Sequence, residues 1–68
     1  MSHRARILKV LSHKDSARLP RTVLEGLART DQDRKAAPAL IDYMLALGEL
    51  KMFGERRGTT YGLAKRRV

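Results

Sequence analysis

The stretch that decides the fold is residues 50–64, LKMFGERRGTTYGLA. Two short segments rich in strand-forming residues, 50–53 and 59–64, lie on either side of a loop that begins and ends with glycine. Glycine adopts the positive φ angles that tight or bulged hairpin loops require. The pattern therefore predicts a β-hairpin whose tip exposes Arg56 and Arg57 to solvent.

The rest of the chain has to support this hairpin with little material. A chain of 68 residues buries only about 60% of its unfolded surface, so it needs an economical core. The chain has no cysteine, which excludes a disulfide framework and a cysteine-based zinc site. His3 and His13 have no clustered carboxylates and are expected to be exposed, so we expect neither a structural metal nor a cofactor. We expect one domain, residues 1–64, followed by a basic tail, 65–68.

The charge is large and unevenly distributed. The formal net charge is +8 and the sequence pI is about 10.9, which is typical of a protein that binds polyanions. Residues 1–21 carry six basic groups and one acidic group, and so do residues 51–68. Residues 22–50 carry three basic and five acidic groups. Both ends of the chain are cationic and the middle is not.

No segment resembles a membrane span or a secretory signal. The longest apolar stretches, 36–41 and 44–47, are interrupted by Pro38 and Asp42, whereas a span needs roughly 20 apolar residues. The N-terminus has basic residues but no long apolar core of a signal peptide. We therefore expect a cytoplasmic protein with no membrane partner, associated with the nucleoid if its source is bacterial or phage.

Two helices and a short strand are predicted before the middle of the chain. Ser2 is suited to cap a first helix that ends near His13. A two- or three-residue strand is predicted within 17–20. Pro20 suits the first turn of a second helix, 20–28, because its missing N–H is not needed there. The expected apolar faces are Ile7, Leu8 and Leu11 for the first helix and Val23, Leu24, Leu27 and Ala28 for the second.

A third helix is the longest segment with helical periodicity. Proline in a helix interior costs about 3 kcal/mol, so Pro38 predicts that the regular helix begins near Ala36 or Ala37. Gly48 is expected to end it as the residue just beyond the C-cap. The apolar positions at helical spacing are Ala37, Leu40, Ile41, Met44, Leu45 and Leu47.

The order of these elements resembles the winged helix-turn-helix family. The similarity is carried by LPRTVLEGLA at 19–28, APALIDYMLALGELK at 37–51 and GERRGTTYGLA at 54–64. The spacing ML-x-L-G-x-L, in which a glycine separates the last helical turn from the first wing strand, is frequent in that family. The resemblance covers residues 4–64. It implies an α+β fold with a three-helix, helix-turn-helix core and a C-terminal β-hairpin wing.

The resemblance also implies a DNA-binding surface. Arg56 and Arg57 on the wing would contact phosphates or the minor groove, although charged residues also simply keep a hairpin tip soluble. The third helix would enter the major groove, but of its expected exposed residues only Arg34 and Lys35 suit base recognition. Tyr43 could donate to a phosphate or pack against the wing. The other candidate contacts are Arg4, Arg18, Arg21 and Lys51, for which a purely solvated role is an equal alternative; the remaining exposed positions of the third helix are Ala36, Pro38, Ala39 and Asp42.

These features favour a small basic protein that binds double-stranded DNA, as a transcriptional regulator or as a phage, plasmid or nucleoid accessory factor. The alternatives are a protein-interaction module that modulates a DNA-bound protein, and an RNA- or ribosome-binding winged helix. A homodimer is a further option, with Leu45 or Leu47 at the contact. No residues form a nucleophile, base and oxyanion site, a P-loop or an HExxH motif, so we expect no enzymatic activity and no small-molecule substrate.

Overall fold

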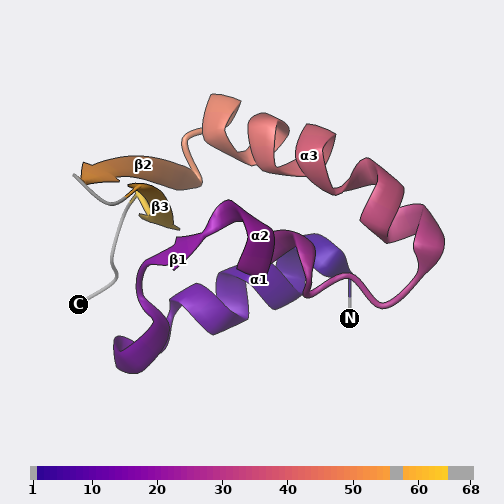
Figure 1. Cartoon of the computed structure of the whole chain (residues 1–68), viewed down its shortest axis with the longest axis horizontal. Helices are drawn as coiled ribbons and strands as arrows, with labels where there is room; N and C mark the ends of the chain where they lie inside the picture. Colours follow the sequence, from indigo (N-terminus) through magenta and orange to yellow (C-terminus); the bar gives the residue numbers. More distant parts are fainter. Residues whose placement is uncertain (1, 56–57, 65–68) are drawn as a thin grey trace.

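A helix and a short strand are followed by two successive helices and then by a β-hairpin, in an α+β arrangement (Figure 1). The structure, a computed structural model, describes residues 2–55 and 58–64. The elements are α1 (His3–Leu11), a single 3-10 turn η1 (Lys14–Ser16), β1 (Leu19–Pro20), α2 (Arg21–Glu25), α3 (Asp31–Ala46), β2 (Leu50–Glu55) and β3 (Gly58–Leu63).

The three strands form one antiparallel sheet in the order β1-β3-β2. The ladder between β2 and β3 runs from the pair Leu50–Leu63 to the pair Glu55–Gly58, which confirms the predicted hairpin. Gly58 has a φ of 139°, whereas Gly54 lies within β2 at an ordinary φ. The strands therefore extend closer to the tip than the sequence pattern predicts.

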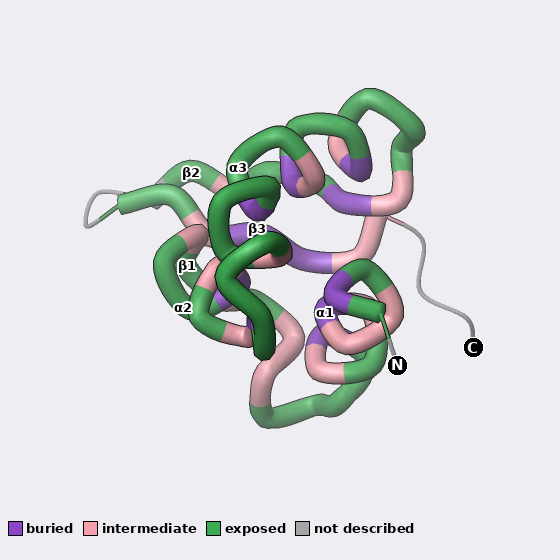
Figure 2. The backbone as a smooth tube through the Cα atoms, turned by 90° about the vertical axis from the view of Figure 1, so that its right-hand side faces the viewer, coloured by how far each residue is buried: buried purple, intermediate pink, exposed green. Residues whose placement is uncertain are grey.

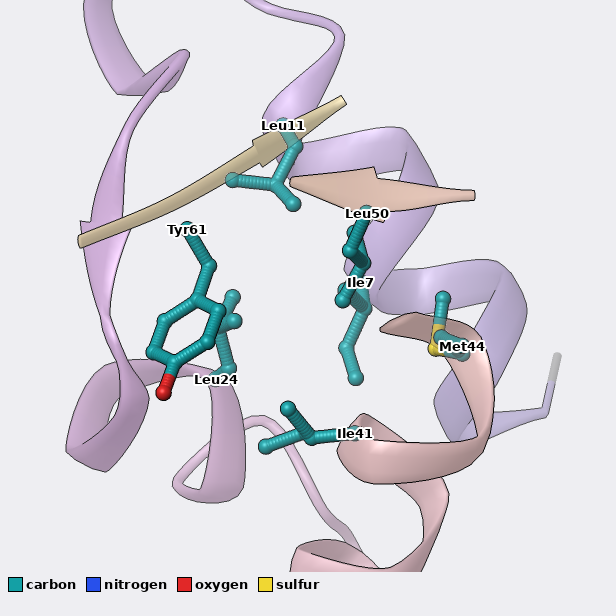
Figure 3. Close-up of a cluster of buried hydrophobic side chains, with 7 residues drawn as sticks. All are labelled: Ile7, Leu11, Leu24, Ile41, Met44, Leu50 and Tyr61. Atoms are coloured by element: carbon teal, nitrogen blue, oxygen red, sulfur yellow. The ribbon is translucent and has the colours of Figure 1, made fainter. Parts of the chain in front are cut away.

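The core lies between α3, the other two α-helices and the hairpin strands (Figures 2 and 3). Its members come from all three α-helices and from both hairpin strands, and each is at most 5% exposed. Burial of such a side chain contributes about 1.5–3 kcal/mol. The hairpin is thus held to the helices by shared packing through Leu50 and Tyr61, which lie at the first and third pairs of its ladder. The cluster comprises Ile7, Leu11, Leu24, Ile41, Met44, Leu50 and Tyr61.

Helix α1 begins as predicted and ends two residues earlier than predicted. The N–H of Ala5 donates to the Ser2 hydroxyl at 3.1 Å, which satisfies a donor that the helix start leaves unpaired. At the other end, the Ser12 hydroxyl donates to the carbonyl of Lys9 at 2.6 Å. The Ser16 hydroxyl donates to the carbonyl of Val10 at 2.7 Å. These hydroxyls bond to carbonyls of the last turn, so α1 stops at Leu11.

Helix α2 is shorter than predicted. Pro20 is extended, with φ −68° and ψ 157°, and pairs with Thr60 in the sheet, so it precedes the helix and does not form its first turn. Leu24 and Ala28 are buried as expected, but Val23 is 42% exposed. Five helical residues cannot turn all the predicted apolar positions to the core.

The predicted start of α3 is wrong by about one and a half turns. The helix begins at Asp31, and Pro38 lies inside it. The Thr30 hydroxyl accepts from the N–H of Asp33 at 3.0 Å, and acidic residues in the first turn interact favourably with the helix dipole. This capping, together with burial of Ala37, offsets the local cost of the proline.

The end of α3 is a complete Schellman motif. The N–H of Gly48 donates to Leu45 at 3.1 Å and the N–H of Glu49 donates to Met44 at 3.0 Å. Gly48 has a φ of 78°, as its predicted role requires. The turn redirects the chain so that Leu50 enters the core immediately afterwards.

His3 is buried, which corrects the prediction that it is exposed. It is 4% exposed, and its Nε2 donates to the carbonyl oxygen of Leu24 at 2.8 Å. The reason is its position one turn before Ile7, on the buried face of α1. The hydrogen bond joins α1 to α2. His13 is exposed, as predicted.

Two glycine substitutions test the Schellman turn against an ordinary strand position. A Cβ added at Gly48 or at Gly54 meets no atom within 4 Å. Gly48→Ala should lower the free energy of unfolding by about 1–2 kcal/mol, because an L-residue is strained at positive φ. Gly54→Ala is the matched control, expected to change it by less than about 0.5 kcal/mol. Urea denaturation followed by circular dichroism measures both, and equal losses would contradict the assignment.

Candidate nucleic-acid interface

The outer face of α3 carries the predicted recognition residues. Arg34, Lys35 and Tyr43 are all exposed, Tyr43 at 57%. Nη1 of Arg34 lies 2.9 Å from Oδ1 of Asp31, one turn earlier in the same helix. Part of the Arg34 charge is therefore balanced locally. Ala36, Pro38, Ala39 and Asp42 are exposed as well, so the face offers few groups for base recognition.

Arg21 joins three elements and does not project freely from α2. Its Nη2 donates to Oδ1 of Asp42 at 2.9 Å and to the carbonyl of Pro38 at 3.0 Å, both on α3. Its Nη1 lies 3.4 Å from the hydroxyl of Tyr61 on β3, and its Nε lies 3.7 Å from Glu25. A phosphate contact by Arg21 stays a prediction, and it would compete with these bonds.

The electrostatic surroundings of Arg21 agree with this bridging role. The hydrogen bond to the Tyr61 hydroxyl, followed by that to Asp42, raises the pKa of Arg21 above its usual value. Because the raised pKa lies above the working range, the side chain stays charged at neutral pH. Its contribution to stability is fully present below the unfolded-state pKa and is lost only in strong alkali.

Arg4 likewise pairs with an acidic residue that is distant in sequence, Glu49, which lies just beyond the C-terminus of α3. Its guanidinium forms a two-pronged ion pair with Glu49, with Nε 2.9 Å from Oε1. The hydrogen bond and the charge of Glu49 raise the pKa of Arg4. Arg6 lies two residues further along α1, and its Nη1 donates to the carbonyl of Leu27 at 3.1 Å. These arginines connect α1 to the α3–β2 turn and to α2.

Arg18 and Lys51 lie together at the sheet. Cζ of Arg18 is 4.0 Å from the centroid of the Phe53 ring, and Nζ of Lys51 is 5.9 Å from the same centroid. Phe53 is partly buried, and its ring supports both cations. Both cations are exposed. The structure thus brings together two predicted contact residues that are far apart in the sequence.

The predicted wing contacts Arg56 and Arg57 lie outside the described residues, and so does the basic tail 65–68. The ladder that precedes them is described up to the pair Glu55–Gly58. Their role as DNA contacts stays a prediction.

Ion pairing divides the charges of the described ranges into two sets. Glu25, Asp31, Asp42 and Glu49 each contact an arginine. Two of these pairs cannot be predicted from the sequence pattern, because Arg4 and Glu49 are 45 residues apart and Arg21 and Asp42 are 21 apart. Several exposed cations have no ion pair within residues 2–55 and 58–64: Lys9, Lys14, Arg29, Lys35 and Lys51.

The part of the chain that the structure describes lacks two other kinds of feature. No group of three or more histidine, cysteine or acidic side chains there is arranged to hold a metal ion. None of the helices there has the length and apolar character needed to cross a membrane.

Comparison with known proteins gives no match. No protein-family model matches the chain, and searches of curated proteins and of solved structures find no significant similarity.

The bridging role of Arg21 predicts a strong difference between two arginine-to-lysine changes. Arg21→Lys keeps the charge but loses the fork that reaches Asp42, Pro38 and Tyr61, so it should lower the free energy of unfolding by about 1–2 kcal/mol. Arg34→Lys is the control at an exposed pair within one helix, expected to change it by less than about 0.5 kcal/mol. Urea midpoints measure both, and an unchanged midpoint for Arg21→Lys would exclude the bridging role.

Proposed function

We propose that this chain is a winged helix-turn-helix protein that binds double-stranded DNA, as a small transcriptional regulator or a nucleoid, phage or plasmid accessory factor. Two features support the proposal. The element order places a β-hairpin directly after the third helix, as in the family that the sequence resembles. The net charge of +8 favours a polyanionic partner.

The observation that carries the proposal is the pairing of acidic side chains with arginines of the same chain. Four of the carboxylates are already held by Arg4, Arg21 or Arg34. They neutralise structural arginines and leave lysines such as Lys35 and Lys51 exposed. Cations that lack an internal counter-charge attract phosphate and release its counterions on binding. The surplus positive charge is therefore available to a ligand.

The proposed mode of binding relies on phosphates more than on bases. Arg56 and Arg57 would supply wing contacts, and Lys35 would contact phosphate from the first turns of α3. Arg34 would first have to leave Asp31. Beside Gln32 and Tyr43, the exposed face of α3 offers mainly alanines, a proline and an ion-paired aspartate. Phosphate contacts position a protein on DNA but do not specify sequence, so we expect weak sequence preference.

The salt dependence of DNA binding tests this mode. The affinity of the wild type for labelled duplex DNA, measured by fluorescence anisotropy, should fall steeply with salt concentration. Arg56→Ala/Arg57→Ala should weaken binding and reduce the slope of log Kobs against log salt by about two, because each phosphate contact contributes about 0.9.

A charge-matched control separates the wing from net charge. Lys9→Ala/Lys14→Ala removes two exposed lysines on α1 and η1, and circular dichroism checks that both variants fold. The control should retain a steeper slope than the wing variant. Equal slopes would show that any two charges suffice, and absence of wild-type binding to duplex at low salt would refute the function.

A second candidate function is favoured by the apolar part of α3. Tyr43 and Leu47 lie one turn apart and are 57% and 53% exposed, while Asp42 beside them carries a negative charge. Large exposed apolar groups are enriched in protein interfaces. In this alternative the outer face of α3 docks on a protein, and the basic groups hold nearby nucleic acid.

The two functions predict different effects of one double variant on the affinity for duplex DNA. If α3 lies in the major groove, Tyr43→Ala/Leu47→Ala should weaken duplex binding at least about tenfold, since each lost contact costs about 1 kcal/mol. If α3 docks on protein, duplex affinity should stay within about twofold of wild type, because neither residue carries charge. The anisotropy titration decides between them.

A further inference from the structure

A hollow of about 340 Å³ opens beside the sheet, and none of its described lining residues belongs to α3. Its lining comes from the segment before β1 and from both hairpin strands. Alternation along the strands puts Lys51 and Phe53 on one face of β2, opposite Gly62 and Thr60 of β3. The opposite face carries the core residues Leu50 and Tyr61. The lining residues are Ala17, Arg18, Lys51, Phe53, Gly62, Leu63 and Ala64.

Gly62 shapes the floor of this hollow. A Cβ at this position would lie 2.8 Å from the carbonyl oxygen of Ala17 and 3.0 Å from a ring carbon of Phe53. Both distances are too short for an unperturbed contact, and the first involves backbone. The glycine therefore lets the segment before β1 and the Phe53 ring close on the sheet, which brings Arg18 over the ring.

The charge of the hollow has one sign among its described lining residues. Arg18 and Lys51 both lie over Phe53, with Cζ at 4.0 Å and Nζ at 5.9 Å from the ring centroid. None of the lining residues that the structure describes is acidic. A guanidinium that stacks through its face keeps its N–H groups at the edge, where they can donate. Lys51 has no ion pair among the described residues, so an anion in the hollow would supply its counter-charge and could also accept from Arg18.

We propose that this hollow binds one backbone phosphate of a nucleic-acid strand, with Arg18 and Lys51 as its ligands and Phe53 as their support. The proposal rests on the nucleic-acid-binding function above and extends it to a third surface, distinct from α3 and from Arg56 and Arg57. The volume is at the small end of ligand pockets, about 300–1,000 Å³. A phosphate group with part of its sugar is a ligand of that size class, and the apolar rim of Leu63 and Ala64 suits the sugar.

Nuclear magnetic resonance titration tests the site directly. The probes are the dinucleotide d(TpT), which has one phosphodiester, thymidine, which has none, and inorganic phosphate. We expect d(TpT) to shift the amide resonances of Phe53 and Gly62 saturably, and thymidine to leave them unchanged. Lys51→Gln should weaken d(TpT) binding roughly tenfold, the effect of losing one charge-assisted hydrogen bond.

A matched variant and a duplex titration complete the test. Lys35→Gln removes one exposed lysine from α3 and should leave the d(TpT) titration unchanged. In the anisotropy assay, Lys51→Gln should reduce the salt slope for duplex by about one. Arg18→Gln, a change at the second ligand, should reproduce the loss of d(TpT) binding.

The outcomes separate this site from the proposed function. If d(TpT) shifts the hollow but wild type fails to bind duplex, the phosphate site stands and the duplex function falls. Equal shifts with thymidine would overturn the site as one for phosphate. Binding of inorganic phosphate without d(TpT) would overturn a nucleic-acid ligand. Equal weakening by Lys35→Gln would show a general charge effect and overturn the assignment.

Discussion

Ile41 and Met44 lie on the buried face of α3, and their packing is the contact on which the other elements depend. Both side chains are fully buried and meet residues from α1, α2, β2 and β3 in one cluster. No disulfide supplements this core, since the chain lacks cysteine. Because the Schellman turn at Gly48 follows directly, the position of α3 also determines where the hairpin leaves the body of the protein. Core packing thus positions α3 and the described part of the sheet relative to each other.

The basic residues fall into structural and available groups. Arg4 and Arg21 connect segments that are distant in sequence, and each holds carboxylates that would otherwise repel a polyanion. A planar guanidinium suits this task because it can donate in several directions at once. Exposed lysines such as Lys35 and Lys51 are left without an internal ion pair among the described residues. This division explains how a chain with a net-acidic middle can still present positive charge.

Local signals predicted the start of α1 and the end of α3, but not the other ends of the helices. Ser2 and Gly48 were recognised because a cap depends on hydrogen bonds within a few residues. Helix α3 starts earlier than the sequence predicts because capping by Thr30 and burial of Ala37 outweigh the local cost of Pro38. His3 was wrongly expected to be exposed, since nothing in the sequence shows that α2 covers the first turn of α1.

The sequence by itself determined the helical and strand segments, the hairpin and the excess of positive charge, because periodicity, caps and composition act locally or over the whole chain. Only the tertiary structure decided which arginines hold internal partners, because the pairs Arg4–Glu49 and Arg21–Asp42 span 45 and 21 residues. It also decided that Arg18, Lys51 and Gly62 surround one hollow. Strand pairing brings those residues together, and no short-range pattern encodes the pairing of β1 with β3.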